Sequence, residues 1–193
     1  TSDPVQFYDT YEIDGKKIGY LFYTSYATGF NNSLFEAFTK FKNDNISDLV
    51  LDLRYNPGGS VSTAGYLLSL IAPKEYVENK SLFTKMSYNA FVNSVYDQKG
   101  WERGSRLGYY NKETDTNPIN GNLDLNKVYI ITTNQSASAS ELTTFCLRPF
   151  MDVVHIGEKT SGKYTASWTL HAYNNFDNRA QPIYDENKMS KDD

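Results

Sequence analysis

The alternation of apolar runs with helical patterns constrains this chain more than any other feature of its sequence. Apolar runs with the length and composition of buried strands lie at 17–26, 46–54, 127–133 and 152–158. Apolar residues recur at helical spacing in the segments between them, at 31–45, 61–71 and 138–148. Strands that alternate with helices predict an α/β fold with layered elements and a mostly parallel sheet.

Other segments have less regular patterns. Residues 1–16 are expected to form an N-terminal extension before a core at 17–193, and residues 185–193 a frayed, charged tail. Residues 73–126 are expected to be an insertion or lid with one strand, at 81–91. A Ser33 cap is expected to precede the helix that carries Leu34, Phe35, Phe38 and Phe41, and a fifth strand is expected at 163–173.

Charge and composition exclude several classes of function. The 193 residues have a net charge of −4 and a sequence pI near 5.2, so the chain lacks the basic surface that nucleic-acid binding requires. No apolar run approaches the roughly 18 residues of a membrane span, so stable membrane insertion is not expected. The single cysteine, Cys146, excludes an internal disulfide framework and is interpreted as a buried thiol.

The two histidines offer little chemistry. His155 and His171 both lie in runs of strand composition and neither has a second histidine at metal-ligand spacing, so both are interpreted as structural. No G-x-S-x-G sequence presents a serine for a Ser-His-Asp triad. No metal or organic cofactor is therefore expected, and a serine nucleophile would need a base other than histidine.

Two strand-to-helix turns have the composition of a binding site, because such sites gather at the carboxyl ends of parallel strands. In the first turn, DLRYNPGG at 52–59, Gly58 and Gly59 permit positive φ and expose amide N–H groups, while Asp52 and Arg54 are interpreted as a structural charge pair. In the second turn, NQSASASELTT at 134–144, Ser138 begins an S-x-x-E capping box. A helix start made of small residues is the simpler interpretation of that turn.

A third turn, GEKTSGKYT at 157–165, places Lys163 where its amine can point back toward the other two. A lysine serves as a base for a serine when burial lowers the lysine pKa enough to leave part of it neutral near pH 7. Because the chain has 19 cationic residues, spacing alone does not select this one.

The three turns together, LDLRYNPGG, TTNQSASASELTT and GEKTSGK, resemble the catalytic core of the C-terminal processing peptidases, the tail-specific S41 serine proteases, whose core is shared with tricorn protease. The resemblance spans roughly residues 16–172 and implies a ClpP/crotonase-like layered core. It implies Ser138 as nucleophile and Lys163, 25 positions later, as base, within about 2.6–3.2 Å of each other. Gly58 or Gly59 and Ala139 would supply the oxyanion donors, and Ser136 and Ser140 would be structural.

The chain also departs from that family. A PDZ-like domain usually precedes the core, and residues 1–16 cannot form one. Many members have a glutamine four residues after the lysine to orient it, and this chain has Ser167 there, which we interpret as a possible orienting residue. The resemblance implies an exported bacterial endopeptidase of the periplasm or cell envelope, acting on polypeptides near their C-termini. The oligomeric state is not predicted.

Two other functions remain open. A non-catalytic peptide- or lipid-binding module could keep the same core, although the presence of both Ser138 and Lys163 argues against it. An acyl-CoA hydratase on a related core would need a carboxylate pair and would have no reason to keep the lysine. Labelling of Ser138 by a serine-reactive phosphonate distinguishes the peptidase from the binding module.

Overall fold

The computed structural model describes residues 2–166, 173–174 and 181–182. Its central sheet has the order β1-β2-β3-β6-β7. These strands are β1 (Val5–Ile13), β2 (Lys16–Tyr23), β3 (Asp48–Asp52), β6 (Lys127–Thr132) and β7 (Asp152–Gly157). Strands β2, β3, β6 and β7 are parallel, and β1 pairs antiparallel with β2. The mostly parallel sheet is confirmed, and most of the expected N-terminal extension forms its edge strand β1.

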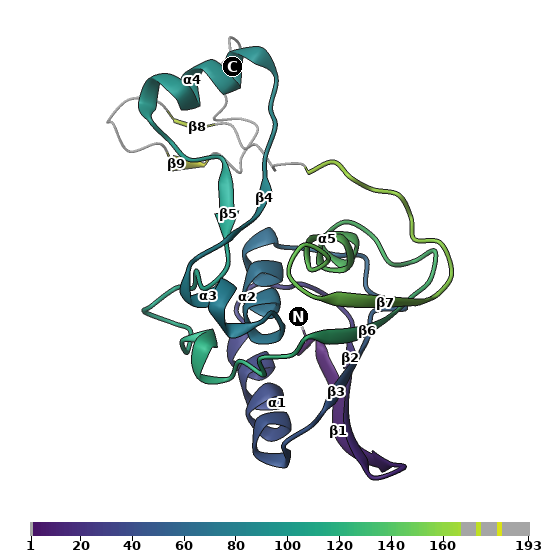
Figure 1. Ribbon diagram of the computed structural model, residues 1–193. Helices are drawn as coiled ribbons and strands as arrows, with labels where there is room; N and C mark the ends of the chain where they lie inside the picture. Colours follow the sequence, from purple (N-terminus) through teal and green to yellow (C-terminus); the bar gives the residue numbers. More distant parts are fainter. Residues whose placement is uncertain (1, 167–172, 175–180, 183–193) are drawn as a thin grey trace.

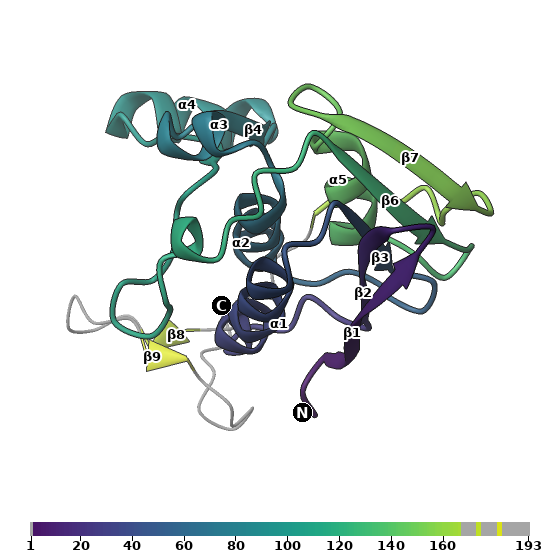
Figure 2. The same cartoon turned by 60° about the horizontal axis from the view of Figure 1, so that its bottom comes forward.

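Three helices cover one face of this sheet (Figures 1 and 2). They are α1 (Asn31–Asp44), α2 (Val61–Ile71) and α5 (Ala139–Cys146). Helix α1 begins after Phe30, so the expected Ser33 cap is wrong: Ser33 lies in the first turn of the helix, and its hydroxyl donates to Asp3 Oδ2 at 2.6 Å. The helical face was predicted correctly, since Leu34, Phe38 and Phe41 are buried.

The core lies between the sheet and the three helices. Leu21, Leu51 and Ile130 occupy matching positions on β2, β3 and β6, and all three are fully buried. Because side chains alternate along a strand, this row places one continuous apolar layer under the helices. Phe38 and Phe41 of α1 belong to the same core.

The segment 73–126 contributes Val77, Leu107 and Leu125 to the core, and its middle part projects from this body. It contains α3 (Lys74–Glu78), β4 (Leu82–Lys85), α4 (Ala90–Lys99), β5 (Gly104–Arg106) and the short 3-10 helix η1 (Pro118–Asn120). Strands β4 and β5 form an antiparallel arm with α4 at its end (Figure 1). The strand predicted at 81–91 is therefore too long. Asn89 caps α4 by accepting a hydrogen bond from the Val92 N–H at 2.9 Å, which ends extended structure before residue 90.

The chain after β7 differs from its prediction. Residues 163–166 form no strand, and residues 161–166 are all exposed. A β-rich composition is not sufficient for a strand, which also needs a partner for its backbone N–H and C=O groups. Ser167 and His171 lie outside the described residues, beyond which β8 (Tyr173–Asn174) pairs with β9 (Gln181–Pro182). Within the described ranges, every helix is too short or too polar to cross a bilayer.

We predict that Leu51→Ala lowers the free energy of unfolding by about 2–5 kcal/mol, because it leaves a cavity in the middle of the buried row. Urea denaturation followed by circular dichroism measures the change. The control is Ile156→Ala on edge strand β7, where the side chain is 44% exposed and the cost should be below about 1 kcal/mol. Equal losses in the two variants would contradict this description of the core.

Candidate active site

The three turns singled out in the sequence lie at one edge of the sheet. Strands β3, β6 and β7 are neighbours and run parallel, so the turns that follow them, at 53–60, 133–138 and 158–163, leave the sheet on the same side. Hydrogen bonds join the third turn to the second: the Glu158 N–H donates to Thr132 O at 3.1 Å, and the Ser161 N–H donates to Ser136 O at 3.0 Å. The topology therefore brings the three motifs together.

Ser136 and Ser140, two of the three alternating serines, form hydrogen bonds between the first turn and the second. The Ser136 hydroxyl donates to Leu53 O at 2.7 Å, and the Ser140 hydroxyl donates to Asn56 O at 2.8 Å. Both side chains are fully buried. Their hydroxyls are committed to backbone carbonyls, which agrees with the structural role expected for them.

Ser138, the middle serine, occupies the exposed side of the same turn. It is only partly buried and forms the N-cap of α5 with φ 55° and ψ −111°. Positive φ is uncommon for a residue with a side chain and costs on the order of 1–3 kcal/mol. A strained strand-to-helix turn of this kind is the geometry by which other hydrolases present a nucleophilic serine. The chain reaches it without the G-x-S-x-G sequence.

Gly58 packs against this turn and Gly59 against the Tyr26 backbone, with φ values of 98° and 143°. A Cβ at Gly58 would lie 2.6 Å from Ala137 O and 2.8 Å from both Ser138 Cβ and Ala139 N. Only glycine fits so close an approach, and its conformation is one that other residues rarely adopt. The expected positive φ at both glycines is confirmed, and Gly58 lies in contact with the Ser138 turn.

The amide groups around Ser138 differ in their availability. The buried Gly58 N–H donates to Asn56 Oδ1 at 2.9 Å. The N–H groups of Gly59 and Ala139 have no acceptor within the part of the chain that the structure describes, and Gly59 is exposed. Of the three candidate oxyanion donors, Gly58 is therefore occupied, while the N–H groups of the exposed Gly59 and the buried Ala139 are unpaired among the described residues.

Glu141 connects the second and third turns through one carboxylate. Its Oε2 accepts from the Ser138 N–H at 2.7 Å, and its Oε1 accepts from the Gly162 N–H at 2.6 Å. Glu141 is 7% exposed. The first bond is half of the capping box predicted from S-x-x-E. The second fixes the residue immediately before Lys163 relative to Ser138.

Lys163 itself forms no hydrogen bond with Ser138. Its side chain is exposed, and it forms no hydrogen bond or ion pair with any residue in the described ranges, so the expected hydrogen bond to Ser138 is not present. The burial that a lysine base needs is likewise not supplied by those residues. The structure places the backbone at 162 against the Ser138 turn and leaves the Lys163 side chain exposed.

Asp52 and Arg54 form a charge pair at the start of the first turn. The fully buried Asp52 side chain accepts from Arg54 Nη2 at 2.7 Å and from the Tyr20 hydroxyl at 2.6 Å, both at Oδ2. Burial by itself raises the pKa of the Asp52 carboxyl, but the bonds from Arg54 and Tyr20 and the guanidinium charge outweigh it, so the pKa lies below its usual value. The structural interpretation of this pair agrees with the geometry.

Two contributors to the site were not recognised from the sequence. Asn56 is fully buried; its Oδ1 holds the Gly58 N–H, and its Nδ2 donates to Tyr23 O at 3.1 Å. Asparagine before Pro-Gly-Gly is a turn signal that pointed to this residue. The bond from Gly162 to Glu141 spans 21 positions, and no local pattern indicates it.

Other candidate groups lie outside this arrangement. His155 contacts the Thr132 side chain across β6 and β7, as its structural interpretation requires. Burial raises the pKa of the Cys146 thiol, which disfavours the reactive thiolate. Among the described residues, no cluster of three or more His, Cys, Asp or Glu side chains has the arrangement of a metal site.

Comparison with known proteins identifies the family. The sequence model of peptidase family S41 matches residues 17–184 of this chain. The chain belongs to peptidase family S41. No curated protein matched its sequence. A Bacteroides fragilis protein assigned to the S41 proteases has 32% identity and a TM-score of 0.73, over 89% of this chain and 43% of that one.

Two more distant structures resemble this S41 chain in fold alone. The photosystem II D1 C-terminal processing protease has 18% identity and a TM-score of 0.55, over 84% of this chain and 38% of its own. A lipoprotein from Streptococcus agalactiae has 17% identity and a TM-score of 0.52, over 88% of this chain and 55% of its own. The S41 chain therefore spans about half or less of each of these proteins.

We predict that Asp52→Asn lowers the free energy of unfolding by about 1–3 kcal/mol near pH 7, the usual contribution of hydrogen bonds to a charged group. A depressed folded-state pKa contributes stability above the unfolded value of about 3.9 and loses it as pH falls through the folded pKa. The difference between wild type and variant should therefore shrink below about pH 4. Urea titrations from pH 7 to pH 2.5 measure it.

Asp48→Asn, at the partly buried first position of β3, is the matched control for loss of a carboxylate on the same strand. A difference between wild type and Asp52→Asn that stays constant down to pH 2.5 would contradict the depressed Asp52 pKa.

Proposed function

We propose that this chain is the catalytic core of a serine endopeptidase, with Ser138 as nucleophile and Lys163 as general base. The observation that carries the proposal is the Glu141 carboxylate, which binds the N–H of Ser138 and the N–H of Gly162. It holds the backbone beside Lys163 against the turn that presents the serine. Membership of the S41 family supports the same assignment.

The free amides support acyl transfer at this serine. Attack of Ser138 Oγ on a peptide carbonyl carbon moves the carbonyl electrons onto oxygen. The N–H groups of Gly59 and Ala139 are the donors we propose for that oxyanion. The serine proton passes to the neutral Lys163 amine and then to the leaving amine, and water hydrolyses the acyl-enzyme by the same route in reverse.

The exposure of Lys163 sets a requirement on this mechanism. An ammonium has no lone pair to accept the serine proton, so Lys163 must first release a proton to the solvent, and removal of water from around the amine favours this neutral form. We propose that the bound polypeptide covers Lys163 and brings its amine to Ser138, because catalytic hydrogen bonds that are long in the free enzyme often tighten in the complex. Ser167, which lies outside the described residues, remains our proposed orienting group for the amine.

The substrate and location are further parts of the proposal. We infer cleavage near the C-termini of exported proteins, supported by the likeness of fold to a D1 C-terminal processing protease. We also infer export to the bacterial envelope, supported by the likeness of fold to a lipoprotein. Cell fractionation with an antibody against the chain tests the location, and recovery only with cytoplasmic proteins would contradict it.

We predict that Ser138→Ala lowers kcat/KM for peptide hydrolysis by at least about 10³-fold, and Lys163→Ala by about 10²–10⁴-fold. A quenched fluorescent peptide library with mass-spectrometric identification of products provides the assay. Exposed residues of the same types provide the controls: Ser94→Ala on α4 and Lys159→Ala on the Lys163 turn should stay within about twofold of wild type. If Lys163→Ala were as active as Lys159→Ala, the assignment of Lys163 as the general base would be wrong.

A serine-reactive fluorophosphonate separates the peptidase from a non-catalytic binding module. The probe should label Ser138 in the wild type, should fail on Ser138→Ala, and should label Lys163→Ala more slowly. Peptide binding without labelling or hydrolysis would favour the binding module and contradict the proposal.

We predict that Glu141→Gln lowers kcat by about 10–100-fold with KM changed less than about threefold, since misplacing a reacting group by roughly 1 Å can cost 10²-fold. Glutamine has the size of glutamate, but its NH₂ group must face an N–H donor of Ser138 or Gly162. The control is Glu158→Gln, an exposed glutamate on the same turn as Gly162. Equal losses of kcat in both variants would mean that the loss of a negative charge, rather than of the two hydrogen bonds of Glu141, is responsible.

A further inference from the structure

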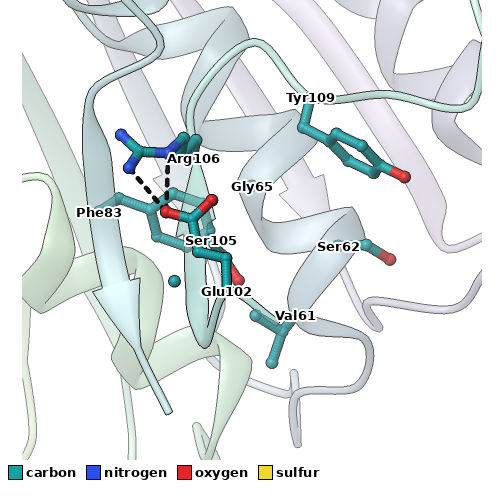
Figure 3. A pocket seen from close by; sticks show the side chains of 9 residues that line it. Val61, Ser62, Gly65, Phe83, Glu102, Ser105, Arg106 and Tyr109 are labelled. Carbon is teal, nitrogen blue, oxygen red and sulfur yellow. Dashed lines mark hydrogen bonds and ion pairs between the residues drawn. The ribbon is translucent and has the colours of Figure 1, made fainter. Parts of the chain in front are cut away.

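A pocket of about 320 Å³ opens between α2 and the β4–β5 arm, outside the three catalytic turns (Figure 3). One wall is the first part of α2, and the opposite wall is β4, β5 and the chain that follows β5. The lining residues are Val61, Ser62, Gly65, Phe83, Glu102, Gly104, Ser105, Arg106 and Tyr109. None of these residues belongs to the proposed nucleophile, base or oxyanion groups.

The pocket begins next to the proposed oxyanion site. Gly59, whose N–H is free, is followed by Ser60, the N-cap of α2, and then by Val61 and Ser62 of the pocket wall. Two virtual bonds of 3.8 Å separate Gly59 and Val61, so their Cα atoms are at most about 7.6 Å apart. A carbonyl oxygen bound by the Gly59 N–H would therefore lie near the Val61 end of the pocket.

The inside of the pocket is mostly apolar. Gly65 has no side chain, and a Cβ there would lie 3.0 Å from Cε1 and Cζ of the Phe83 ring. The ring therefore packs directly on the α2 backbone and forms an apolar surface with Val61. The Ser62 hydroxyl is already paired with Ser60 Oγ at 2.7 Å.

The charged residues of the pocket neutralise each other. Arg106 donates to Glu102 Oε1 through Nη2 at 2.6 Å, and Figure 3 shows this pair lying side by side. Arg106 Nη1 also donates to Lys80 O at 3.2 Å. A charged ligand group would have to compete with these bonds, whereas an uncharged group would leave them intact.

We propose that this pocket receives the side chain of the substrate residue that supplies the scissile carbonyl, and that it selects an apolar side chain of leucine to phenylalanine size. The inference rests on the proposed peptidase function of Ser138. The Cβ of that residue is two bonds from the carbonyl carbon, so its side chain leaves the backbone close to Gly59. The pocket is large enough for one such side chain, which would displace water from its apolar lining.

Fluorogenic peptidyl-aminocoumarins test the inference, because they carry no amino acid after the scissile bond and isolate the carbonyl-side residue. Peptides that differ only in having Ala, Leu, Phe, Glu or Lys there should be cleaved by the wild type with Leu and Phe preferred over Ala. For each methylene group that the pocket buries, we expect kcat/KM to rise about 10–200-fold. Glu and Lys should be cleaved no better than Ala.

Ser62→Trp places a large ring over the pocket from an exposed helical position, and we expect it to reduce the Leu-to-Ala ratio of kcat/KM at least tenfold. The control is Ser94→Trp on α4, which should keep the wild-type ratio. Tyr109→Ala is a second test at a side chain 72% exposed, where folding is not at risk, and it should reduce the Phe-to-Ala ratio about threefold or more.

The outcomes separate the two proposals. Hydrolysis that depends on Ser138 but shows no apolar preference, or ratios unchanged in both pocket variants, would overturn the pocket assignment while the peptidase stands. Absence of both hydrolysis and fluorophosphonate labelling at Ser138 would overturn the peptidase and the pocket assignment with it. Preference for Leu or Phe that is lost in Ser62→Trp and kept in Ser94→Trp supports both.

Discussion

The Glu141 carboxylate is the contact on which the arrangement of this site depends. The parallel sheet brings three turns to one edge, but a sheet fixes only where each turn begins. Glu141 fixes where two of them meet, because its two oxygens bind the N–H groups of Ser138 and Gly162, which are 24 positions apart in sequence. Buried with 7% exposure, it has little freedom to exchange these donors for water.

Asn56 performs the corresponding task between the first and second turns. Its side chain holds the Gly58 N–H, and its backbone carbonyl accepts from the Ala137 N–H at 3.2 Å and from Ser140 Oγ. Occupying the Gly58 amide leaves the neighbouring Gly59 amide as the exposed donor. The strained backbone of Ser138 is thus held by the hydrogen bonds of Asn56, Ser140 and Glu141, and such support from the surroundings is the condition under which strain persists in a folded protein.

The sequence predicted the parts of this structure that depend on local pattern. The row of Leu21, Leu51 and Ile130 follows from apolar strand runs, and positive φ at Gly58 and Gly59 follows from the paired glycines. Patterns failed where a distant partner decides the outcome. Residues 163–166 have the composition of a strand but pair with no strand among the described residues, and the bond from Gly162 to Glu141 involves a backbone amide that carries no sequence signal. The pocket wall at Phe83 likewise depends on how the β4–β5 arm meets α2.

The Ser138 turn is fixed in the fold while the Lys163 side chain is exposed, because the two groups differ in the free energy needed to hold them in place. A neutral hydroxyl on a strained turn is kept in position by the hydrogen bonds of that turn, among them the bond from the Ser138 N–H to Glu141. A desolvated ammonium loses its hydration, a penalty of several kcal/mol that the folded chain would bear at all times if the lysine were buried permanently. An exposed Lys163 on a turn whose backbone is already fixed at Gly162 postpones that penalty until a substrate can offset it by its own contacts. In the proposed peptidase, the nucleophile and oxyanion donors are therefore built into the fold, and the base is completed by the polypeptide it acts on.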